Sequence, residues 1–559
     1  MRLSLRVASA LACASLVFAC AKPDPDKAET WFKRLGSDNT KTKLDALSRL
    51  VKIGDKAAVP MIVPLLEEPG EVRIEAAKAL GKLGDPSAVP ALVEAIDFER
   101  GVGADQASKD ANKANKEIAD ALGMLGDKAA VEPLLQLLTK SRDSFVKAAA
   151  INALGDMGDP RAVETLARVA TDEAEETYVN KKAVQALGNI GDPGAVPAIK
   201  KMLFHERKGV SFYPEASFSA YQIGRAAAAP LLIVLEGRDD ELNKWADDND
   251  IYREALYAKA AQVLGDLNER QAIPTLIKLL AYSRPGVDPD DIDAMALMVR
   301  RTAADVLGRM RATEAVPALM RGLKEDEGNV RAVYANALVA AGDKRALPEL
   351  VACSLKGEVM DKSAHARKGC YVALSRLGDE KSLQQWEAWE QAEPKLTSST
   401  CIKGLDFDPR NEKDKAAAQK HCDDMAANVQ KVLADNKPRL IAAAECKEDS
   451  DCWIGKLKDE NPMVRERAAM ELGRLGDPKA IGPLMAALAD RELEARFAAI
   501  LATDWIASSS KEALEEAKKG LAQLDAQIEQ EKDKVHFAKV NQDLTRLAVK
   551  IRRLDRIGS

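Results

Sequence analysis

A short motif, roughly GDPxAVPxLxxxL, recurs almost to the end of the 559-residue chain and limits the folds that it can adopt. Before each copy, apolar or small residues recur at i, i+4, i+8 and i+11, which places them on one face of an α-helix. The pattern is clear in residues 72–83, 146–157, 330–341 and 464–475. Each helix is expected to end at the glycine of the motif, because glycine readily adopts the left-handed conformation of a helix C-terminus.

The residues after this glycine predict a second helix in each copy. A proline often lies in its first turn, where the missing N–H costs little. Because one helix pair cannot bury both of its apolar faces, the sequence predicts an all-α fold, an α-solenoid of stacked antiparallel helix pairs. The turns between the paired helices recur mostly at about 30–36 residues. They are expected at Gly54, Gly84, Gly126, Gly158, Gly191, Gly265, Gly342 and Gly378, with degenerate turns near Gly224 and Gly308.

The two helices and their turn resemble the HEAT-repeat superfamily, most closely the short bacterial units known from phycobilin lyases and envelope proteins. Matching units run from Thr42 to Asp379 and return from Pro462 to Asp490. The resemblance implies a HEAT-like superhelix but specifies no function, because this solenoid serves scaffolds, lyases and hydroxylases alike. The chain then divides into a repeat array at 29–379, an irregular helical insertion at 380–459, a final unit with an extra helix at 460–510 and a C-terminal segment at 511–559.

The first 19 residues have the parts of a secretory signal peptide, namely a basic start, an apolar stretch and small residues before a cleavage site. The tetrapeptide VFAC that ends at Cys20 resembles the lipobox of bacterial lipoproteins, so we expect a lipid on Cys20 and a tether over 20–28. Acyl chains on one cysteine anchor a protein to a membrane. Because the residue directly after Cys20 is Ala21 and not aspartate, the outer membrane is favoured over the inner one. Cleavage after Ala21 is the alternative and would give a soluble periplasmic protein.

Three additions lengthen the spacing between units, at 98–116, 237–250 and 282–293. Each falls between a second helix and the next first helix, a connection that stays on one edge of a solenoid, so all three should project from the same side. Two of them are acidic and predict a contact ridge for a basic partner surface or for Ca²⁺, although they lack the glycine and closing glutamate of an EF-hand loop. Two solvated loops are the alternative. The acidic residues are Asp239, Asp240, Glu241, Asp247, Asp248, Asp250, Asp288, Asp290, Asp291 and Asp293.

Six cysteines are grouped in the C-terminal half, after a long stretch that has none. They are Cys353, Cys370, Cys401, Cys422, Cys446 and Cys452. An even number of cysteines in an exported chain favours disulfides. The first two flank a turn between antiparallel helices and the last two enclose a short polar loop, so both pairs could form, which leaves the middle pair by elimination. A zinc site that uses His421 is the alternative, without the paired C-x-x-C motifs that usually build one.

The insertion is expected to begin with an acidic helix that carries Trp386 and Trp389, followed by a polar loop at 394–413. The two tryptophans share a helix face and are interpreted as core packing, with an exposed anchor for a partner as the alternative.

At the C-terminus, heptad-like apolar spacing predicts either one long helix available for homodimerisation or a helical hairpin, bent near Asp533, that caps the solenoid.

The composition and motifs give little sign of catalysis. A formal charge of −6 and a pI of about 5.7 argue against nucleic acid as a partner. The four histidines are far apart, and no nucleophile elbow, phosphate-binding glycine loop or zinc-protease motif occurs, so neither a cofactor nor a metal is expected. The favoured function is a non-enzymatic scaffold of the cell envelope that binds unidentified proteins. A bilin-lyase-like or other ligand-binding HEAT enzyme in the periplasm is the alternative.

Overall fold

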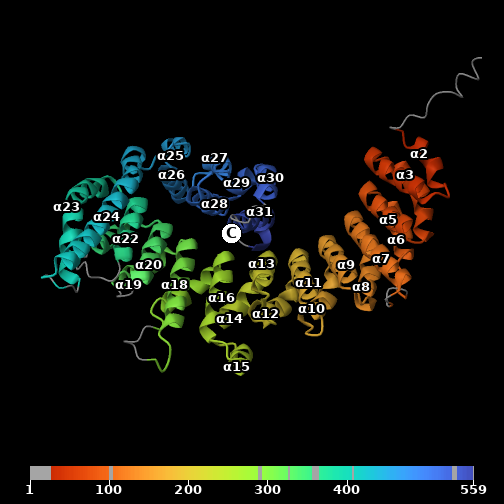
Figure 1. Ribbon diagram of the computed structural model, residues 1–559, viewed down its shortest axis with the longest axis horizontal. Helices are drawn as coiled ribbons and strands as arrows, with labels where there is room; N and C mark the ends of the chain where they lie inside the picture. Colours follow the sequence, from red (N-terminus) through yellow and green to blue (C-terminus); the bar gives the residue numbers. More distant parts are fainter. Residues whose placement is uncertain are drawn as a thin grey trace, which may run out of the picture. The chain divides into compact units, whose positions relative to one another are not determined.

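The computed structural model describes residues 27–557 apart from 100–102, 104, 288–292, 325–327, 356–363, 406–407, 409 and 532–537. The described part is built from helices, with one short two-stranded antiparallel sheet. The chain divides into two compact units, residues 1–219 and 220–559. Paired helices follow one another along each unit, as the sequence predicts for an all-α solenoid (Figure 1).

Unit 1 contains stacked helix pairs and the short hairpin. Its elements are α2 (Glu29–Leu35), α3 (Thr40–Ile53), η1 (Lys56–Ala58), α4 (Val59–Ile62), η2 (Val63–Glu67), α5 (Glu71–Leu83), η3 (Pro86–Ala88), α6 (Val89–Glu94), α7 (Gln106–Leu125), η5 (Lys128–Ala130), α8 (Val131–Lys140), α9 (Ser144–Met157), η6 (Pro160–Ala162), α10 (Val163–Thr171), α11 (Thr177–Ile190), η7 (Pro193–Ala195), α12 (Val196–Phe204), β1 (Glu206–Arg207) and β2 (Val210–Ser211). Helix α13 (Tyr213–Ile223) joins the two units.

Unit 2 continues the array and adds a long helical hairpin. Its elements are η8 (Gly224–Ala227), α14 (Ala228–Leu235), α15 (Asp240–Asp248), α16 (Arg253–Asp266), η9 (Arg270–Ala272), α17 (Ile273–Leu279), α18 (Ala294–Arg309), η10 (Thr313–Ala315), α19 (Val316–Gly322), α20 (Gly328–Ala341), η11 (Lys344–Ala346), α21 (Leu347–Leu355), α22 (Ala364–Leu377), α23 (Glu380–Gly404), α24 (Glu412–Cys446), α25 (Ser450–Lys456), α26 (Pro462–Leu475), η12 (Pro478–Ala480), α27 (Ile481–Ala487), α28 (Leu493–Ala507), α29 (Lys511–Lys519), α30 (Leu521–Glu531) and α31 (Ala538–Ile557).

The turn between paired helices has the predicted chemistry in most units. Helix α5 ends at Gly84, whose φ of 65° lies in the left-handed region. The side chain of Asp85 then accepts a hydrogen bond from the backbone N–H of Ser87, 3.0 Å away, and starts a 3₁₀ turn. The left-handed glycines of this type are Gly54, Gly84, Gly126, Gly158, Gly191, Gly342 and Gly476.

Two of the predicted turn glycines, Gly265 and Gly378, do not adopt this conformation, and the degenerate turn predicted near Gly308 lies at Arg311. Gly265 and Gly308 lie inside α16 and α18, and the left-handed residues that follow these helices are Asn268 and Arg311. A Cβ atom on Gly308 would lie 2.8 Å from the Cα atom of Ala337, so this glycine permits helix contact rather than a turn. Gly378 also departs from the prediction, because Asp379 directly begins α23 with a capping box.

Close contact between successive first helices is a general feature of unit 1. A Cβ atom on Gly81 would lie 2.8 Å from the Cα atom of Ala121, and one on Gly155 would lie 2.9 Å from the Cβ atom of Ala186. Real Cβ atoms essentially never approach so closely, so any larger side chain there forces the helices apart. Where a glycine lies three residues before the turn glycine, as at Gly81 and Gly155, it therefore sets the spacing between successive first helices.

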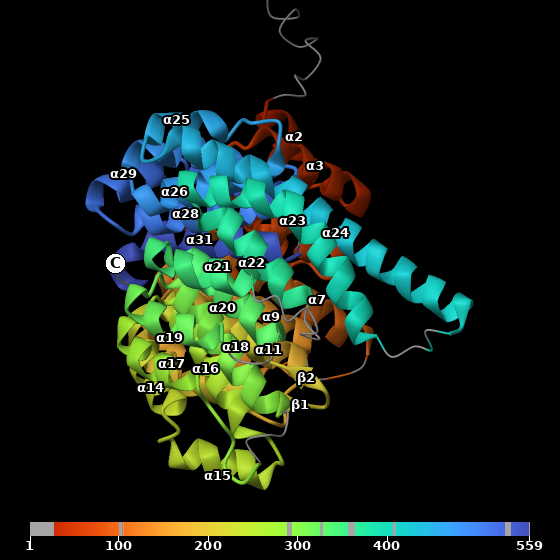
Figure 2. The same cartoon turned by 90° about the vertical axis from the view of Figure 1, so that its left-hand side faces the viewer.

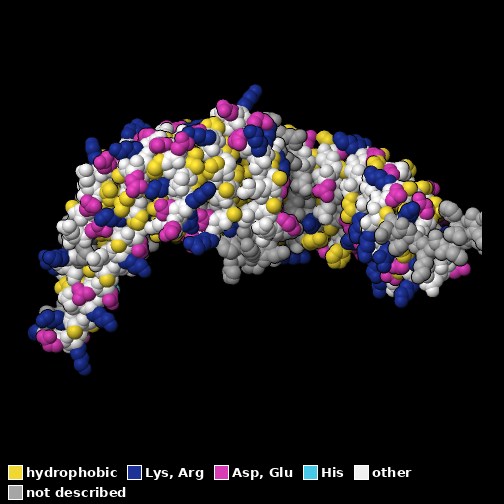
Figure 3. Space-filling view, turned by 90° about the horizontal axis from the view of Figure 1, so that it is seen from above, with side chains coloured by type: hydrophobic (Ala, Val, Ile, Leu, Met, Phe, Trp, Pro, Cys, Tyr) yellow, Lys and Arg dark blue, Asp and Glu magenta, His cyan; other side chains and the backbone are white. Residues whose placement is uncertain are grey.

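The insertion forms an arm rather than a helix and a long polar loop. Helix α23 continues through Pro394 to Gly404 and lies antiparallel to α24, so most of the predicted loop at 394–413 is helical. Thr397 and Cys401, which follow on the same helix, are buried. The pair extends beyond α20 and α22 (Figure 2), and both Lys/Arg and Asp/Glu side chains cover its end, at left in Figure 3.

The two tryptophans on α23 are part of the core. Trp386 and Trp389 are buried, and the Trp386 Nε1–H group donates to the carbonyl oxygen of Leu433, 3.1 Å away. The ring of Tyr371 meets both indoles edge-on. The core-packing interpretation is therefore confirmed.

The C-terminal segment folds as a hairpin. Helices α30 and α31 pack on each other, and α31 also contacts α28 and η8. The apolar residues Leu544, Leu547 and Ile551 are buried within the chain itself, as expected of the capping interpretation. The predicted bend near Asp533 lies outside the described residues.

One helical stretch in the described part of the chain, Tyr213–Leu235, has the length and hydropathy of a membrane span. It consists of α13, η8 and α14, and 61% of it is buried by the protein. A core helix of a globular protein passes the same test.

Candidate partner-binding surfaces

The first acidic addition is a short helix that projects from the edge of unit 2. Residues 237–250 contain α15, which lies apart from the stacked pairs at the lower end of Figure 2. Both the ridge hypothesis and its alternative treat this segment as a loop, and that part is wrong. Asp239 explains the helix, because its buried side chain caps α15 by accepting the N–H of Leu242, 3.1 Å away.

Three of the ten predicted acidic residues have structural partners. Besides the cap at Asp239, Asp247 forms a 2.5 Å ion pair with Arg253, whose hydrogen bond lowers the pKa of Asp247. Asp293 accepts the backbone N–H of Met295 at 2.9 Å and so begins α18. Asp247 is itself exposed, and the exposed carboxylates without such a partner among the described residues are those of Asp240, Glu241, Asp248 and Asp250. Asp288, Asp290 and Asp291 lie outside the described residues.

The structure places the two acidic additions side by side. The guanidinium of Arg284 lies 5.5 Å from the ring centroid of Tyr252, which follows α15, and 3.0 Å from the Oδ2 atom of Asp293. Nearby, the hydroxyl of Tyr282 donates to the Oε1 atom of Glu254 at 2.7 Å. These contacts join the two segments into one surface, which we call the acidic edge: α15, Asp250, Tyr252, Arg284 and Asp293. Within the described residues no group of three metal-binding side chains occurs.

The six cysteines lie at bonding distance in the three pairs considered from the sequence. Cys353 pairs with Cys370, Cys401 with Cys422 and Cys446 with Cys452, with Cα–Cα distances of 5.9, 5.5 and 5.3 Å. The middle pair fastens α23 to α24 near the end of the arm. Cys20, the predicted lipidation site, lies outside the described residues.

Alkylation tests this pairing directly. Iodoacetamide added to the denatured, unreduced protein should modify none of these six cysteines, and after reduction it should modify all six. Peptide mass spectrometry gives the readout for each site. Alkylation of any one of them without reductant, or metal released from the protein by acid, would contradict the pairing.

A second surface arises where the final unit meets α22 and the arm. Helix α26 carries Arg467, which is almost completely buried. Its Nη1 and Nη2 atoms donate to the carbonyl oxygens of Ser375 and Gly378, each at 3.0 Å, and Nη2 lies 2.6 Å from Glu471. These two carbonyls lie at the C-terminal end of α22, where helix carbonyls lack intrahelical partners. Burial lowers the pKa of Arg467 from its ordinary value.

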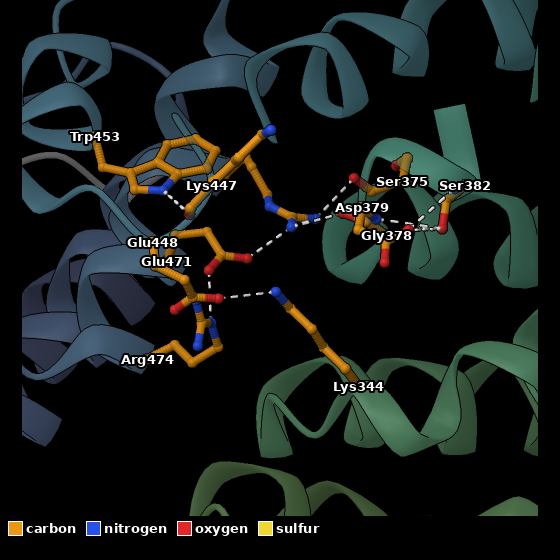
Figure 4. Close-up of polar contacts among 11 residues, drawn as sticks. Lys344, Ser375, Gly378, Asp379, Ser382, Lys447, Glu448, Trp453, Glu471 and Arg474 are labelled. Carbon is orange, nitrogen blue, oxygen red and sulfur yellow. Dashed lines mark hydrogen bonds and ion pairs between the residues drawn. The ribbon is translucent and has the colours of Figure 1, made fainter. Parts of the chain in front are cut away.

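Further charges surround this contact. Arg474 bridges Glu471 and Glu448, at 2.6 Å from each, and Lys344 lies 3.0 Å from Glu448 (Figure 4). The hydrogen bond from Arg474 lowers the pKa of Glu448. These ion pairs link α26 and the residues after α24 to η11.

A third group of charges lies one turn earlier on α26. Glu466 accepts from Arg439 on α24 and pairs with Arg376 on α22 at 2.7 Å. Arg439 also donates to Asn436. Its pKa is lowered, mainly because burial disfavours the charged form. Three helices that are distant in sequence are thus joined by one carboxylate.

The final unit also folds back onto earlier repeats of unit 2. Trp505 Nε1–H donates to the carbonyl oxygen of Arg309 at 3.1 Å, and Arg311 donates to the carbonyl oxygen of Gly473 at 2.9 Å. From α31, Arg546 pairs with Asp266 at 3.2 Å, and its carbonyl oxygen accepts the hydroxyl of Tyr221. Helices α26, α28 and α31 therefore lie against the first helices of the preceding units, which are α16, α18, α20 and α22 (Figure 1).

This closure was not predicted, although the sequence contains a signal for it. Gly473 in α26 and Gly155 in α9 are the glycines of close helix contact in their units. Counted back from them, Arg467 and Glu471 occupy the positions of Ala149 and Ala153. Charged residues on the buried face of a repeat helix need partners. Charged residues at positions that carry alanine in α9 therefore predict an additional packing surface on the final unit.

A cleft of about 750 Å³ opens beside these charges. Its walls come from α22, α24, and the N-terminal turns of α26 and α28. It is lined by Val372, Arg376, Asp424, Ala427, Asn428, Lys431, Val432, Asp435, Asn436, Arg439, Pro462, Met463, Glu466, Glu492 and Glu494.

The sequence matches family models of repeat proteins along most of its described length. HEAT repeats match residues 28–101, 104–178, 292–360 and 453–529, which together exceed half of the chain. The PBS lyase HEAT-like repeat matches residues 179–205 and 256–282. No curated protein matches the chain.

Solved structures with some similarity are helical-repeat proteins of low identity. Yeast importin-β (Kap95p) is 14% identical, with 89% of this chain and 69% of that chain covered and a TM-score of 0.40. Human deoxyhypusine hydroxylase is 22% identical, with coverage of 52% and 98% and a TM-score of 0.21. The CpcE–CpcF complex of phycocyanin lyase from a Nostoc species is 20% identical, with coverage of 60% and 97% and a TM-score of 0.22.

Proposed function

Because the chain belongs to the HEAT-repeat family, we propose that it is a non-enzymatic protein–protein interaction scaffold of the cell envelope, exported and held at the membrane by lipid on Cys20. Solenoids of this kind present extended surfaces to other proteins. The signal-like first 19 residues support export. Three disulfides are typical of proteins in oxidising compartments and support it further.

The observation that carries the proposal is the construction of the acidic edge. Asp239, Asp247 and Asp293 hold its segments in place, whereas Asp240, Glu241, Asp248 and Asp250 remain exposed. Exposed carboxylates on a fixed element attract a basic protein surface and orient it. The partner is therefore a protein with a basic patch. The apolar side of α31 is already buried within the chain, so homodimerisation through that helix is not part of the proposal.

Crosslinking in the native membrane tests this function. In the variant Asp240→Asn, Glu241→Gln, Asp248→Asn, Asp250→Asn, we expect capture of the partner to fall about tenfold, because the edge loses four charges. The matched control removes four exposed carboxylates of unit 1 through Glu94→Gln, Glu132→Gln, Glu164→Gln and Glu173→Gln. Equal capture by both variants would contradict a role for the acidic edge.

The lipid anchor has its own readout in the same preparation. Intact mass of the mature protein should show acyl chains on Cys20, and Cys20→Ser should move the protein from the membrane to the soluble fraction. Cleavage after Ala21 would instead give an unmodified soluble protein in the wild type and overturn the anchor.

A bilin-lyase-like or other ligand-binding enzyme is the second candidate, supported by the two PBS lyase HEAT-like matches. An enzyme of this type needs a pocket with converging polar groups. Absorbance of the purified protein for a bound chromophore separates the two functions. A protein recovered with a chromophore and without a protein partner would favour the enzyme.

A further inference from the structure

We propose that the cleft between α22, α24, α26 and α28 binds a lysine- or arginine-containing peptide segment of a partner protein. The site is separate from the acidic edge and goes beyond the function proposed above. Its volume of about 750 Å³ lies within the range of ligand-binding pockets. That space accommodates a short stretch of peptide rather than a folded domain.

Unpaired carboxylates surround the cleft. Asp424 and Asp435 lie on α24, and Glu492 and Glu494 lie at the start of α28. All four are exposed, and their side chains form no ion pair or hydrogen bond with any described residue. This differs from the charges of α26, which are paired throughout. Free carboxylates on opposite walls recognise cationic side chains that enter between them.

Two arginines that are paired with Glu466 form the inner wall of the cleft. The Nε atoms of Arg376 and Arg439 are buried and have no acceptor in the structure, although the Nη atoms of both arginines are bonded to Glu466. Arg439 is only 3% exposed. Arg73, Arg207, Arg467 and Arg546 have the same kind of buried Nε atom and do not line the cleft, so these donors shape its wall and do not identify a ligand.

Apolar residues complete the site. Val372, Val432 and Met463 line the cleft between the charged groups, so aliphatic parts of lysine or arginine side chains have surface to pack on. A single metal ion does not fit the same data, because the described residues contain no group of three ligands close enough to hold one. The combination of an apolar floor and a rim with four exposed carboxylates, against Lys431 as the single exposed cation of the lining, favours a cationic peptide.

The cleft is held in shape before any ligand binds. Glu466 joins α22 and α24 to α26 through Arg376 and Arg439. Arg465 forms two hydrogen bonds with Asp490, at 2.6 and 2.8 Å, and so fixes the residues that precede α28. A preformed site binds a flexible peptide with a smaller ordering cost.

Fluorescence anisotropy with a labelled probe tests the proposal. The probe is a short fluorescein-labelled peptide of alternating lysine and leucine, and the control peptide has glutamate in place of lysine. We expect the full-length protein to bind the lysine probe and not the glutamate peptide. The affinity should fall as salt is raised, because ion pairs at an exposed rim are screened.

The decisive variant removes the rim charges through Asp424→Asn, Asp435→Asn, Glu492→Gln and Glu494→Gln. We expect about tenfold weaker probe binding, and unchanged binding by the unit 1 control with four Glu→Gln substitutions. Circular dichroism establishes that each variant is folded. Equal affinity of wild type and rim variant, or loss of affinity in the unit 1 control alone, would overturn the assignment.

The same variants separate this inference from the proposed scaffold function. The rim variant should retain partner capture at the acidic edge, and the acidic-edge variant should retain probe binding. Loss of probe binding in both variants would show that the probe senses overall charge and would overturn the cleft as its site.

Discussion

Replacing Arg467 by leucine is expected to destabilise unit 2 by about 3–5 kcal/mol. The substitution leaves the carbonyl oxygens of Ser375 and Gly378 buried without the donors that reach them at 3.0 Å. It also removes one of the two arginines paired with Glu471. Removing one partner of a buried ion pair leaves the other charge buried and unpaired, which costs several kcal/mol. Replacing both partners by apolar residues costs far less stability.

Urea unfolding followed by tryptophan fluorescence measures this loss. Trp31 is the only tryptophan of unit 1, and the other five lie in unit 2, so the signal reports mainly on unit 2. Arg321→Leu is the control, because Arg321 is exposed, and it should change the free energy of unfolding by no more than about 0.5 kcal/mol.

A second variant separates the charge effect from the packing effect. In Arg467→Leu with Glu471→Leu, both members of the pair are removed, so part of the lost stability should return. If the single and double variants unfolded like the Arg321→Leu control, the contact between α26 and α22 would contribute little to the stability of unit 2.

Local periodicity was sufficient to predict the repeat architecture. The alternation of two amphipathic helices with a glycine–aspartate turn is a property of neighbouring residues, and at Gly84 and Asp85 the expected turn and cap are present. The same reasoning misplaced the turn at Gly265, because glycine can occupy either of two positions three residues apart in a unit, and here the second position is Asn268. One gives the turn and the other permits helix contact, and sequence spacing alone does not distinguish them.

The candidate surfaces were predictable to different degrees. The acidic edge could be placed because connections between repeats stay on one edge, but the helical form of α15 depends on the cap at Asp239. The cleft could not be placed. It depends on contacts between α24 and α26 that are set by the fold-back of the final unit, and residues as far apart as Val372 and Glu494 contribute to it.

Replacing Gly155 by leucine is expected to destabilise the stack of α9 and α11 by about 3 kcal/mol. A Cβ atom at this position would already lie 2.9 Å from the Cβ atom and 3.0 Å from the Cα atom of Ala186, so the added side chain must push the two helices apart. Gly158→Leu is the matched control three residues later. Its φ of 62° is unfavourable for leucine, but no atom lies within 4 Å of the new Cβ, and the cost should be about 1–2 kcal/mol.

Hydrogen exchange measured by mass spectrometry resolves the two effects along the chain. Because each repeat contacts mainly its neighbours, Gly155→Leu should speed exchange in α9 and α11 while α3 stays close to wild type. Gly158→Leu should affect chiefly the turn at 158–162 and less of α11. A larger effect of Gly158→Leu than of Gly155→Leu on α11 would mean that the turn, rather than close contact between first helices, sets the spacing of the repeats.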